Sequence, residues 1–177
     1  MTKTHTASAT GRREERDGTA YLVFERTFRA PIEDVWAAVT ESDRLVRWIG
    51  HWSGDPTRGA VSFWMTAEAE DAPEETIHID ECSAPQRLVM RSARPDDHSL
   101  EWRWQLDLDE SQGVTTLTFA QEVADSTLAE GVGPGWDYYL DRLVAAETGD
   151  DLDADLAAID FDDYFPALSE HYRRELA

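Results

Sequence analysis

The chain has 177 residues, 41% of them hydrophobic and 10% aromatic, which is enough apolar material for one folded domain and too much for a disordered chain. It carries 16 Lys and Arg against 37 Asp and Glu, and the net charge of -21 argues against nucleic acids and anionic membranes as partners. No apolar run approaches the roughly 18 residues of a membrane span. The single cysteine, Cys82, excludes a disulfide framework and a cysteine-based zinc site. Because the first residues lack the apolar core of a secretory signal, we predict a cytoplasmic protein.

The acidic charge has two explanations. Hydrated carboxylates keep proteins soluble in a salty cytoplasm, where screening relieves the repulsion between them. A genome rich in G and C also favours Arg, Ala and Asp over Lys. Lys3 is the only lysine of the chain. Both explanations predict that scarcity, so the sequence leaves them open.

The N-terminal part predicts a leader followed by a strand. Residues 1–19 are polar and show no periodicity, and we expect a flexible leader there. Residues 21–28, YLVFERTF, are rich in β-branched and aromatic residues and predict a strand. Alternation places four of its side chains on one face: Leu22, Phe24, Arg26 and Phe28.

Two short helices are predicted after this strand. Pro31 suits a first helical turn, and the following apolar residues recur at helical spacing, namely Ile32, Val35, Trp36 and Val39. Ser42 is a candidate cap for a second helix that ends at Gly50.

Alternating apolar residues then predict a meander of five antiparallel strands, around residues 61–65, 77–79, 88–90, 100–109 and 115–123. The clearest pattern is SLEWRWQLDLDE. Its period of two places one set of side chains toward the core: Leu100, Trp102, Trp104, Leu106 and Leu108. The intervening Glu101, Arg103 and Gln105 are expected to point outward.

The C-terminal part predicts a long helix and an acidic extension. The glycines and proline of residues 131–135 predict a break in the chain, and helical spacing begins at Trp136. Residues 147–163 hold eight acidic and no basic residues, which predicts a solvated linker with at most a weak helical turn. A terminal amphipathic segment follows, outlined by Phe161, Tyr164, Phe165, Leu168 and Tyr172. We therefore expect a leader over 1–19, one domain over 20–148 and an extension over 149–177.

Local motifs resemble a known family. The run FERTFRAPIEDVWAAVTESDRLVRWIG, then PQRLVMRS and GPGWDYYLDRL, occur in the order typical of proteins similar to the activator of the heat-shock-protein-90 ATPase. That family belongs to the SRPBCC superfamily, with START domains and the birch pollen allergen. The resemblance implies an α+β helix-grip fold, in which a curved antiparallel sheet wraps around a long C-terminal helix and two short helices follow the first strand.

The resemblance also implies a cavity between sheet and helix. The sequence places many large apolar residues where they would line it, and we predict these as ligand-binding residues: Trp48, Trp52, Phe63, Met65, Met90, Trp102, Trp104, Phe119, Trp136, Tyr139, Leu140 and Leu143. The same side chains could also fill the space as an ordinary core, because aromatic stripes on strands are usually core. The sequence leaves an open and a filled cavity as alternatives.

Catalytic and metal-binding patterns are weak. The acidic surroundings of Cys82 disfavour a thiolate, and the five histidines include no pair spaced for a helical zinc site. The segment GVGPG lacks the spacing of a phosphate-binding loop. We predict no catalytic residues, no metal site and no cofactor.

The function predicted from the sequence is the binding of a small hydrophobic or aromatic ligand, and the chain is not expected to be an enzyme. Two alternatives remain. One is an enzyme of the polyketide cyclase or aromatase type, which needs polar groups that converge on the ligand. The other is an interaction module, either co-chaperone-like or stress-related, whose terminal aromatic segment docks on a partner or on a second copy in a homodimer.

Overall fold

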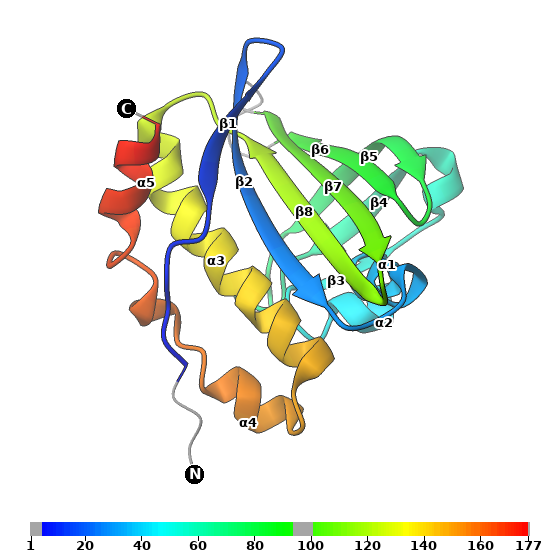
Figure 1. Cartoon of the computed structure of the whole chain (residues 1–177). Coiled ribbons are helices and arrows are strands. Elements are labelled where there is room, and N and C mark those ends of the chain that lie inside the picture. Colours follow the sequence, from blue (N-terminus) through cyan, green and yellow to red (C-terminus); the bar gives the residue numbers. More distant parts are fainter. Residues whose placement is uncertain (1–4, 94–100, 177) are drawn as a thin grey trace. The chain divides into compact units, whose positions relative to one another are not determined.

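The computed structural model describes residues 5–93 and 101–176 (Figure 1). These residues fall into two compact units. One unit contains residues 27–121, and the other combines the chain up to Arg26 with the chain from Glu122 onward. The strand order is β1-β2-β8-β7-β6-β5-β4-β3. Strand β1 pairs antiparallel with β2, and the strands from β3 to β8 pair antiparallel with their neighbours.

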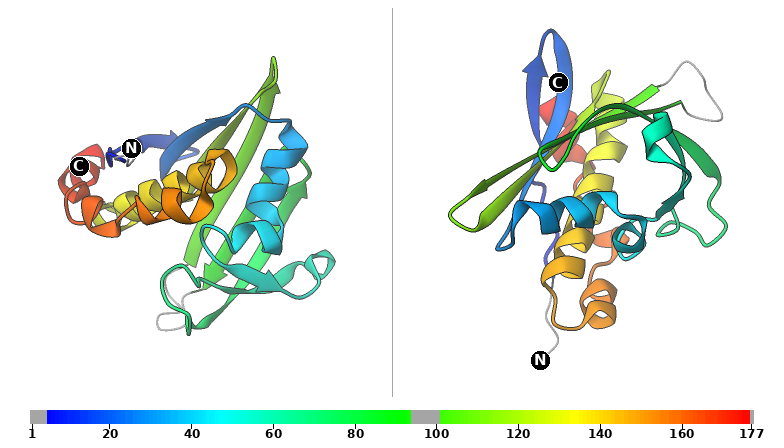
Figure 2. Two further views of the ribbon diagram at one scale, coloured as in Figure 1. Left: turned by 90° about the horizontal axis from the view of Figure 1, so that it is seen from below. Right: turned by 90° about the vertical axis from the view of Figure 1, so that its right-hand side faces the viewer.

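The unit of residues 27–121 begins with two short helices and continues with strands (Figure 2). The helices are α1 (Ile32–Thr40) and α2 (Ser42–Leu45). The following elements are β3 (His51–Ser53), the 3-10 turn η1 (Pro56–Arg58), β4 (Ala60–Trp64), β5 (Glu74–Ser83), β6 (Arg87–Ala93), β7 (Glu101–Ser111) and β8 (Val114–Glu122).

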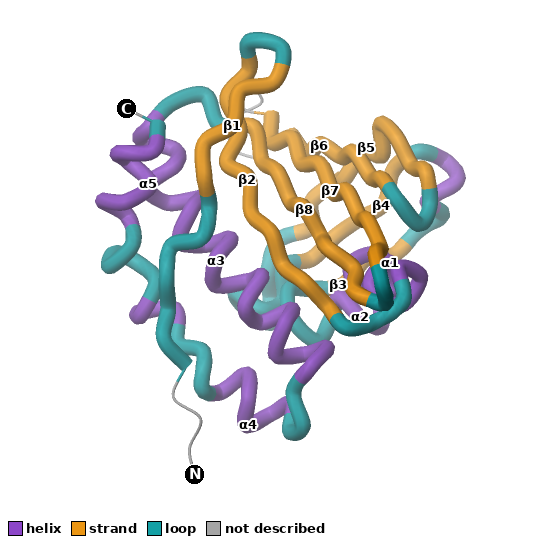
Figure 3. The backbone as a smooth tube through the Cα atoms, viewed as in Figure 1, coloured by secondary structure: helices purple, strands orange, loops and turns teal. Residues whose placement is uncertain are grey.

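The other unit contains most of the helical residues (Figure 3). Its elements are β1 (Arg12–Arg16), β2 (Thr19–Phe28), α3 (Ser126–Thr148), α4 (Leu152–Ala157), the 3-10 turn η2 (Phe161–Asp163) and α5 (Ser169–Glu175). Helix α5 packs on the N-terminal half of α3, where the Ser169 hydroxyl donates to the Glu130 carbonyl at 2.8 Å.

The element order confirms the predicted α+β helix-grip fold: a strand, two short helices, an antiparallel meander and a long helix of 23 residues. The predicted facing of β7 is also confirmed for its described residues. Leu106 and Leu108 are buried and Trp102 and Trp104 half-buried on one face, whereas Glu101 and Arg103 are exposed on the other. Leu100 lies outside the described residues.

The predicted leader contains a strand. Residues 12–16 form β1, which turns into β2 through Asp17 and Gly18, both at positive φ. Asp-Gly is favoured in the two-residue turns of hairpins because both positions require φ above zero. The prediction of a flexible leader did not include this local turn signal.

The glycines of residues 131–135 do not break the chain, so the predicted start of the long helix is wrong. Helix α3 begins ten residues before Trp136, at Ser126, where Asp125 accepts hydrogen bonds from the amides of Thr127 and Leu128. Gly133 is needed there because a Cβ atom at this position would overlap the ring of Tyr172. Tertiary packing therefore outweighs the low helix propensity of the segment.

Two smaller predictions also need correction. Ser42 is not a helix cap: it is the first residue of α2, the N-cap position is occupied by Glu41, and no side chain caps the helix. The Ser42 hydroxyl instead donates to the Trp52 carbonyl at 2.7 Å and accepts from the Trp52 amide at 2.9 Å. Helix α2 ends at Leu45 rather than Gly50, and the short strand β3 was not predicted.

Candidate functional site

Large apolar side chains gather on one face of the strands of the 27–121 unit. Trp52 lies opposite Phe63, and Met90 lies opposite Trp104, and cross-strand partners point to the same face of a sheet. Ile77 connects the two pairs, because β5 lies between β4 and β6 in the strand order and shares this face with both. We call the following residues the aromatic face: Trp52, Phe63, Met90, Trp102 and Trp104, together with the polar Glu75, Ser92 and Gln121.

The aromatic face continues directly into a row of buried core residues. Its five apolar side chains are all half-buried, whereas the next rows along the same strands are buried, namely Leu88, Leu106, Leu108 and Phe119. One continuous face of the sheet therefore changes from closed core to rings that keep part of their surface accessible.

Three polar side chains lie among these rings. The Ser92 hydroxyl donates to Glu75 at 3.3 Å, and the Trp104 indole N–H donates to the Gln121 side-chain oxygen at 2.9 Å. Ser92 and Gln121 are buried. None of the three was among the predicted site residues. For Glu75 a signal was present, because alternation along β5 places it on the same face as the apolar Ile77, from which this strand was predicted.

The remaining predicted ligand-binding residues of this unit lie elsewhere. Trp48 is buried in the core, where its indole N–H donates to the Ala38 carbonyl at 3.1 Å. Phe119 is one of the buried core residues described above, and the half-buried Met65 follows the end of β4. Five of the eight predicted residues of this unit thus come together on the aromatic face.

The other four predicted residues lie on α3. Trp136, Tyr139, Leu140 and Leu143 share one side of this helix by their spacing. The last three are buried and Trp136 is half-buried, with its ring centroid 6.1 Å from that of Tyr139.

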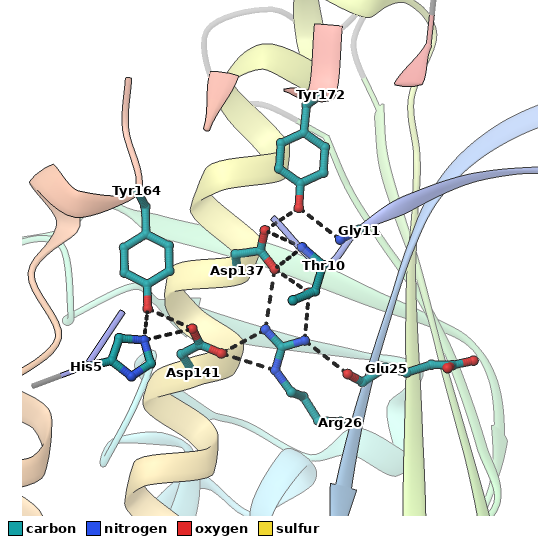
Figure 4. A network of polar contacts seen from close by, with 9 residues as sticks. All are labelled: His5, Thr10, Gly11, Glu25, Arg26, Asp137, Asp141, Tyr164 and Tyr172. Atoms are coloured by element: carbon teal, nitrogen blue, oxygen red, sulfur yellow. Dashed lines mark hydrogen bonds and ion pairs between the residues drawn. The ribbon is translucent and has the colours of Figure 1, made fainter. Parts of the chain in front are cut away.

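A network of polar contacts occupies another side of α3 (Figure 4). Its centre is Arg26 of β2, which forms ion pairs with Asp141 at 2.8 Å and with Asp137 at 3.4 Å. The Asp137 side chain is completely buried, and the Arg26 side chain is only 10% exposed. One completely buried and one half-buried carboxylate therefore share one guanidinium.

Segments from both ends of the chain complete this network. Asp137 accepts hydrogen bonds from the backbone amide and hydroxyl of Thr10 and from the hydroxyl of Tyr172. The Tyr172 hydroxyl in turn accepts from the Gly11 amide at 2.9 Å. Asp141 accepts from the Tyr164 hydroxyl at 2.7 Å. His5 lies beside this pair, with Nε2 2.6 Å from the Tyr164 hydroxyl oxygen and 3.1 Å from Asp141.

Burial dominates the electrostatics of the network. It raises the pKa of Asp137 above its usual range, because the hydrogen bonds from Thr10 and Tyr172 and the charge of Arg26 offset the desolvation only in part. Burial and the neighbouring carboxylates also raise the pKa of Tyr164 and of Tyr172, so both phenols remain neutral donors. Most of the donors are directed at the two carboxylates and come from Arg26 and the terminal segments. We therefore assign the network to the attachment of those segments rather than to chemistry.

This network was not predicted from the sequence, although two signals were present. Arg26 stood alone among apolar residues on one face of its predicted strand. Asp137 and Asp141 are four residues apart, which places them on the same side of a helix.

Within residues 5–93 and 101–176, no group of three or more His, Cys, Asp or Glu is arranged to hold a metal ion. No helix in the described part of the chain is long and apolar enough to cross a membrane. Cys82 is exposed.

Comparison with known families identifies the fold. Residues 29–147 match the family model of the activator of Hsp90 ATPase homolog 1-like proteins. The chain belongs to this family. The match confirms the resemblance noted from the sequence motifs, and it includes every residue of the aromatic face. No curated protein matches the chain.

Several solved structures share this fold. CalU16 from Micromonospora echinospora is 20% identical with a TM-score of 0.64, covering 93% of this chain and 99% of that chain. EF2215 from Enterococcus faecalis, a conserved protein of unknown function, is 21% identical with a TM-score of 0.67. The match covers 93% of this chain and 89% of that chain. DynU16, a putative protein in the dynemicin biosynthetic locus, is 25% identical with a TM-score of 0.61. The match covers 73% of this chain and 48% of that chain.

Proposed function

We propose that this family member binds a small hydrophobic or aromatic ligand on its aromatic face. The observation that carries the proposal is the change along one sheet face, from buried Leu106 and Leu108 to half-buried Trp102 and Trp104 on the same strand. Rings that were only core would be expected to be covered like their neighbours. Partly accessible rings beside a few fixed polar groups are typical of small-molecule sites.

The polar side chains of the aromatic face would orient such a ligand. Glu75 offers a carboxylate beside Phe63, its cross-strand partner, and receives a hydrogen bond from Ser92. Apolar stacking on the rings would supply most of the affinity, and hydrogen bonds to these groups would select among ligands of similar shape.

A titration with a matched control variant tests the proposal. A panel of small aromatic and aliphatic compounds is screened by thermal shift, and each compound that raises the melting temperature is titrated against tryptophan fluorescence. Trp104→Leu removes a ring of the aromatic face, and Trp64→Leu removes a half-buried ring from the opposite face of the same sheet. We expect the first variant to weaken binding by about tenfold, equivalent to about 1.4 kcal/mol, and the second to leave it unchanged. A panel without any hit, or equal losses in both variants, would count against the proposal.

The enzyme alternative has weaker support. A cyclase or aromatase needs several polar groups that converge on the reacting atoms, and the aromatic face as defined contains one ionisable side chain, Glu75. Cytoplasmic location and a homodimer remain predictions from the sequence.

A further inference from the structure

Two phenylalanines of the acidic extension form an exposed pair. Phe161 and Phe165 are each 42% exposed, and their rings stack with centroids 6.0 Å apart at an interplanar angle of 19°. Among the described residues the only other large apolar side chain with such exposure is Val46, in the other unit. Isolated apolar side chains on a surface need no explanation, but a stacked pair of rings is a localised apolar feature.

The pair is held in a defined position. Tyr164 lies between the two phenylalanines in the sequence, is completely buried and donates to Asp141. The Phe165 amide donates to the Phe161 carbonyl at 3.0 Å, which closes the turn. Tyr138 of α3 contacts Phe161 edge-on, with centroids 5.2 Å apart. The two rings are therefore exposed on an anchored turn rather than on a loose chain end.

Uncompensated carboxylates surround the rings in the sequence. Asp160, Asp162 and Asp163 are exposed, and within the part of the chain that the structure describes they form no ion pair. They end a run of eight acidic residues without a basic one, residues 147–163. An apolar pair beside unpaired negative charge is complementary to a cation with a flat, weakly hydrated surface.

The same cluster already holds such a cation. The guanidinium of Arg142 lies over the ring of Tyr138, 5.4 Å from its centroid, and Tyr138 is the residue in edge contact with Phe161. Guanidinium groups stack on aromatic rings and pair with carboxylates through their N–H groups, whereas the strongly hydrated ammonium of lysine does so less well.

We propose that Phe161 and Phe165, together with Asp160, Asp162 and Asp163, form a docking surface for an arginine-rich segment of another protein. The guanidinium groups stack on the two rings and pair with the adjacent carboxylates. A second copy of this chain is a poorer occupant, because it carries the same net charge of -21. The surface lies outside residues 29–147, which match the family model, and it is independent of the proposed ligand site.

The test compares two labelled peptides of equal charge by fluorescence anisotropy at about 0.15 M salt. One peptide alternates Arg with Gly, and the other has Lys in place of every Arg. We expect the full chain to bind the Arg peptide about fivefold more tightly than the Lys peptide, since each exposed cation–π contact contributes only modestly. Phe161→Leu combined with Phe165→Leu keeps apolar volume but removes the rings, and this variant should bind both peptides equally.

Two controls separate docking from general attraction to an acidic protein. Asp162→Asn with Asp163→Asn should weaken the Arg peptide more than Glu70→Gln with Asp71→Asn, which removes the same charge from an exposed loop of the other unit. Val46→Ala should have no effect. Circular dichroism tests whether each variant is folded. If the double leucine variant does not fold, the comparison of the two charge-removing pairs alone tests the proposal. Absence of binding, no preference for Arg, or equal effects of the two charge pairs would overturn the proposal.

Discussion

Replacement of Asp137 tests how burial and hydrogen bonding balance in the network on α3. Asp137 is completely buried, accepts from Thr10 and Tyr172, and lies 3.4 Å from Arg26, which is closer to Asp141 at 2.8 Å. Asp137→Asn keeps the shape of the side chain and one acceptor oxygen but removes the charge. Asp137→Ala removes the acceptor as well and leaves the Tyr172 hydroxyl without this partner.

The structure gives the expected magnitudes. Asp137→Ala leaves buried donors unsatisfied and should lower the free energy of unfolding by about 3–5 kcal/mol. Asp137→Asn should cost less, about 1–2 kcal/mol at neutral pH, because the amide oxygen still accepts a hydrogen bond.

The pH dependence has a defined sign. Burial raises the pKa of Asp137 in the folded state above its ordinary value of 3.8, so the folded protein binds this proton more tightly than the unfolded chain does. Binding of this proton therefore stabilises the folded state fully at a pH below the ordinary pKa of 3.8. This stabilisation is lost as the pH rises through the higher pKa of the folded state. Wild type should lose stability relative to Asp137→Asn as the pH rises above 3.8, by at most about 1.4 kcal/mol per pH unit.

Urea unfolding of wild type and Asp137→Asn at a series of pH values from about 4 to 7 measures this difference directly. The contributions of all other titrating groups to the pH dependence are the same in both proteins and cancel in the difference. If wild type instead gains stability relative to the variant with rising pH, the ion pair with Arg26 outweighs burial and the pKa of Asp137 is lowered. That result would refute the reasoning.

Three further outcomes are expected. Gly135→Ala, with open space around its position, should raise the free energy of unfolding by about 0.5–1 kcal/mol. Gly133→Ala should lower it, because the new Cβ overlaps the Tyr172 ring. Changes of the same sign for both variants in urea unfolding would contradict this prediction. Potassium chloride should raise the melting temperature as the screening length falls from about 10 Å at 0.1 M to 3 Å at 1 M, and a flat series would show that the charge is not destabilising. Thr10→Val and Tyr172→Phe should be non-additive by about 0.5–3 kcal/mol, since both donate to Asp137; strict additivity in a double-mutant cycle would argue against a shared site.

The regular strands were predictable because their signal is local. The period of two in residues 101–109 fixes which side chains share a face whatever the rest of the chain does, and the structure has Leu106 and Leu108 buried on that face. The aromatic face was predictable in part for the same reason. Its apolar members were identified, but Glu75 and Gln121 were not, because a polar residue at an inward position looks like an interruption of the pattern when only one strand is considered.

The features that were missed depend on contacts between distant residues. Gly133 is compatible with a helix because the ring of Tyr172 occupies the space where a side chain would lie, and no property of residues 131–135 reveals that neighbour. The partners of Asp137 are likewise far away in the sequence, at Thr10, Arg26 and Tyr172. The burial of an aspartate can be inferred only when its donors are known.

The two carboxylates of α3, Asp137 and Asp141, also explain why the acidic extension has defined structure. Residues 147–163 have little apolar surface of their own and carry like charges that repel, so local interactions favour an open chain. Tyr164 and Tyr172 follow this run, and each is completely buried and donates to a carboxylate of α3. Buried polar networks add little net stability but tolerate few alternative arrangements, since every other arrangement leaves a donor or a charge unpaired. The network thus determines where the extension attaches, and the exposed position of Phe161 and Phe165 follows from that attachment.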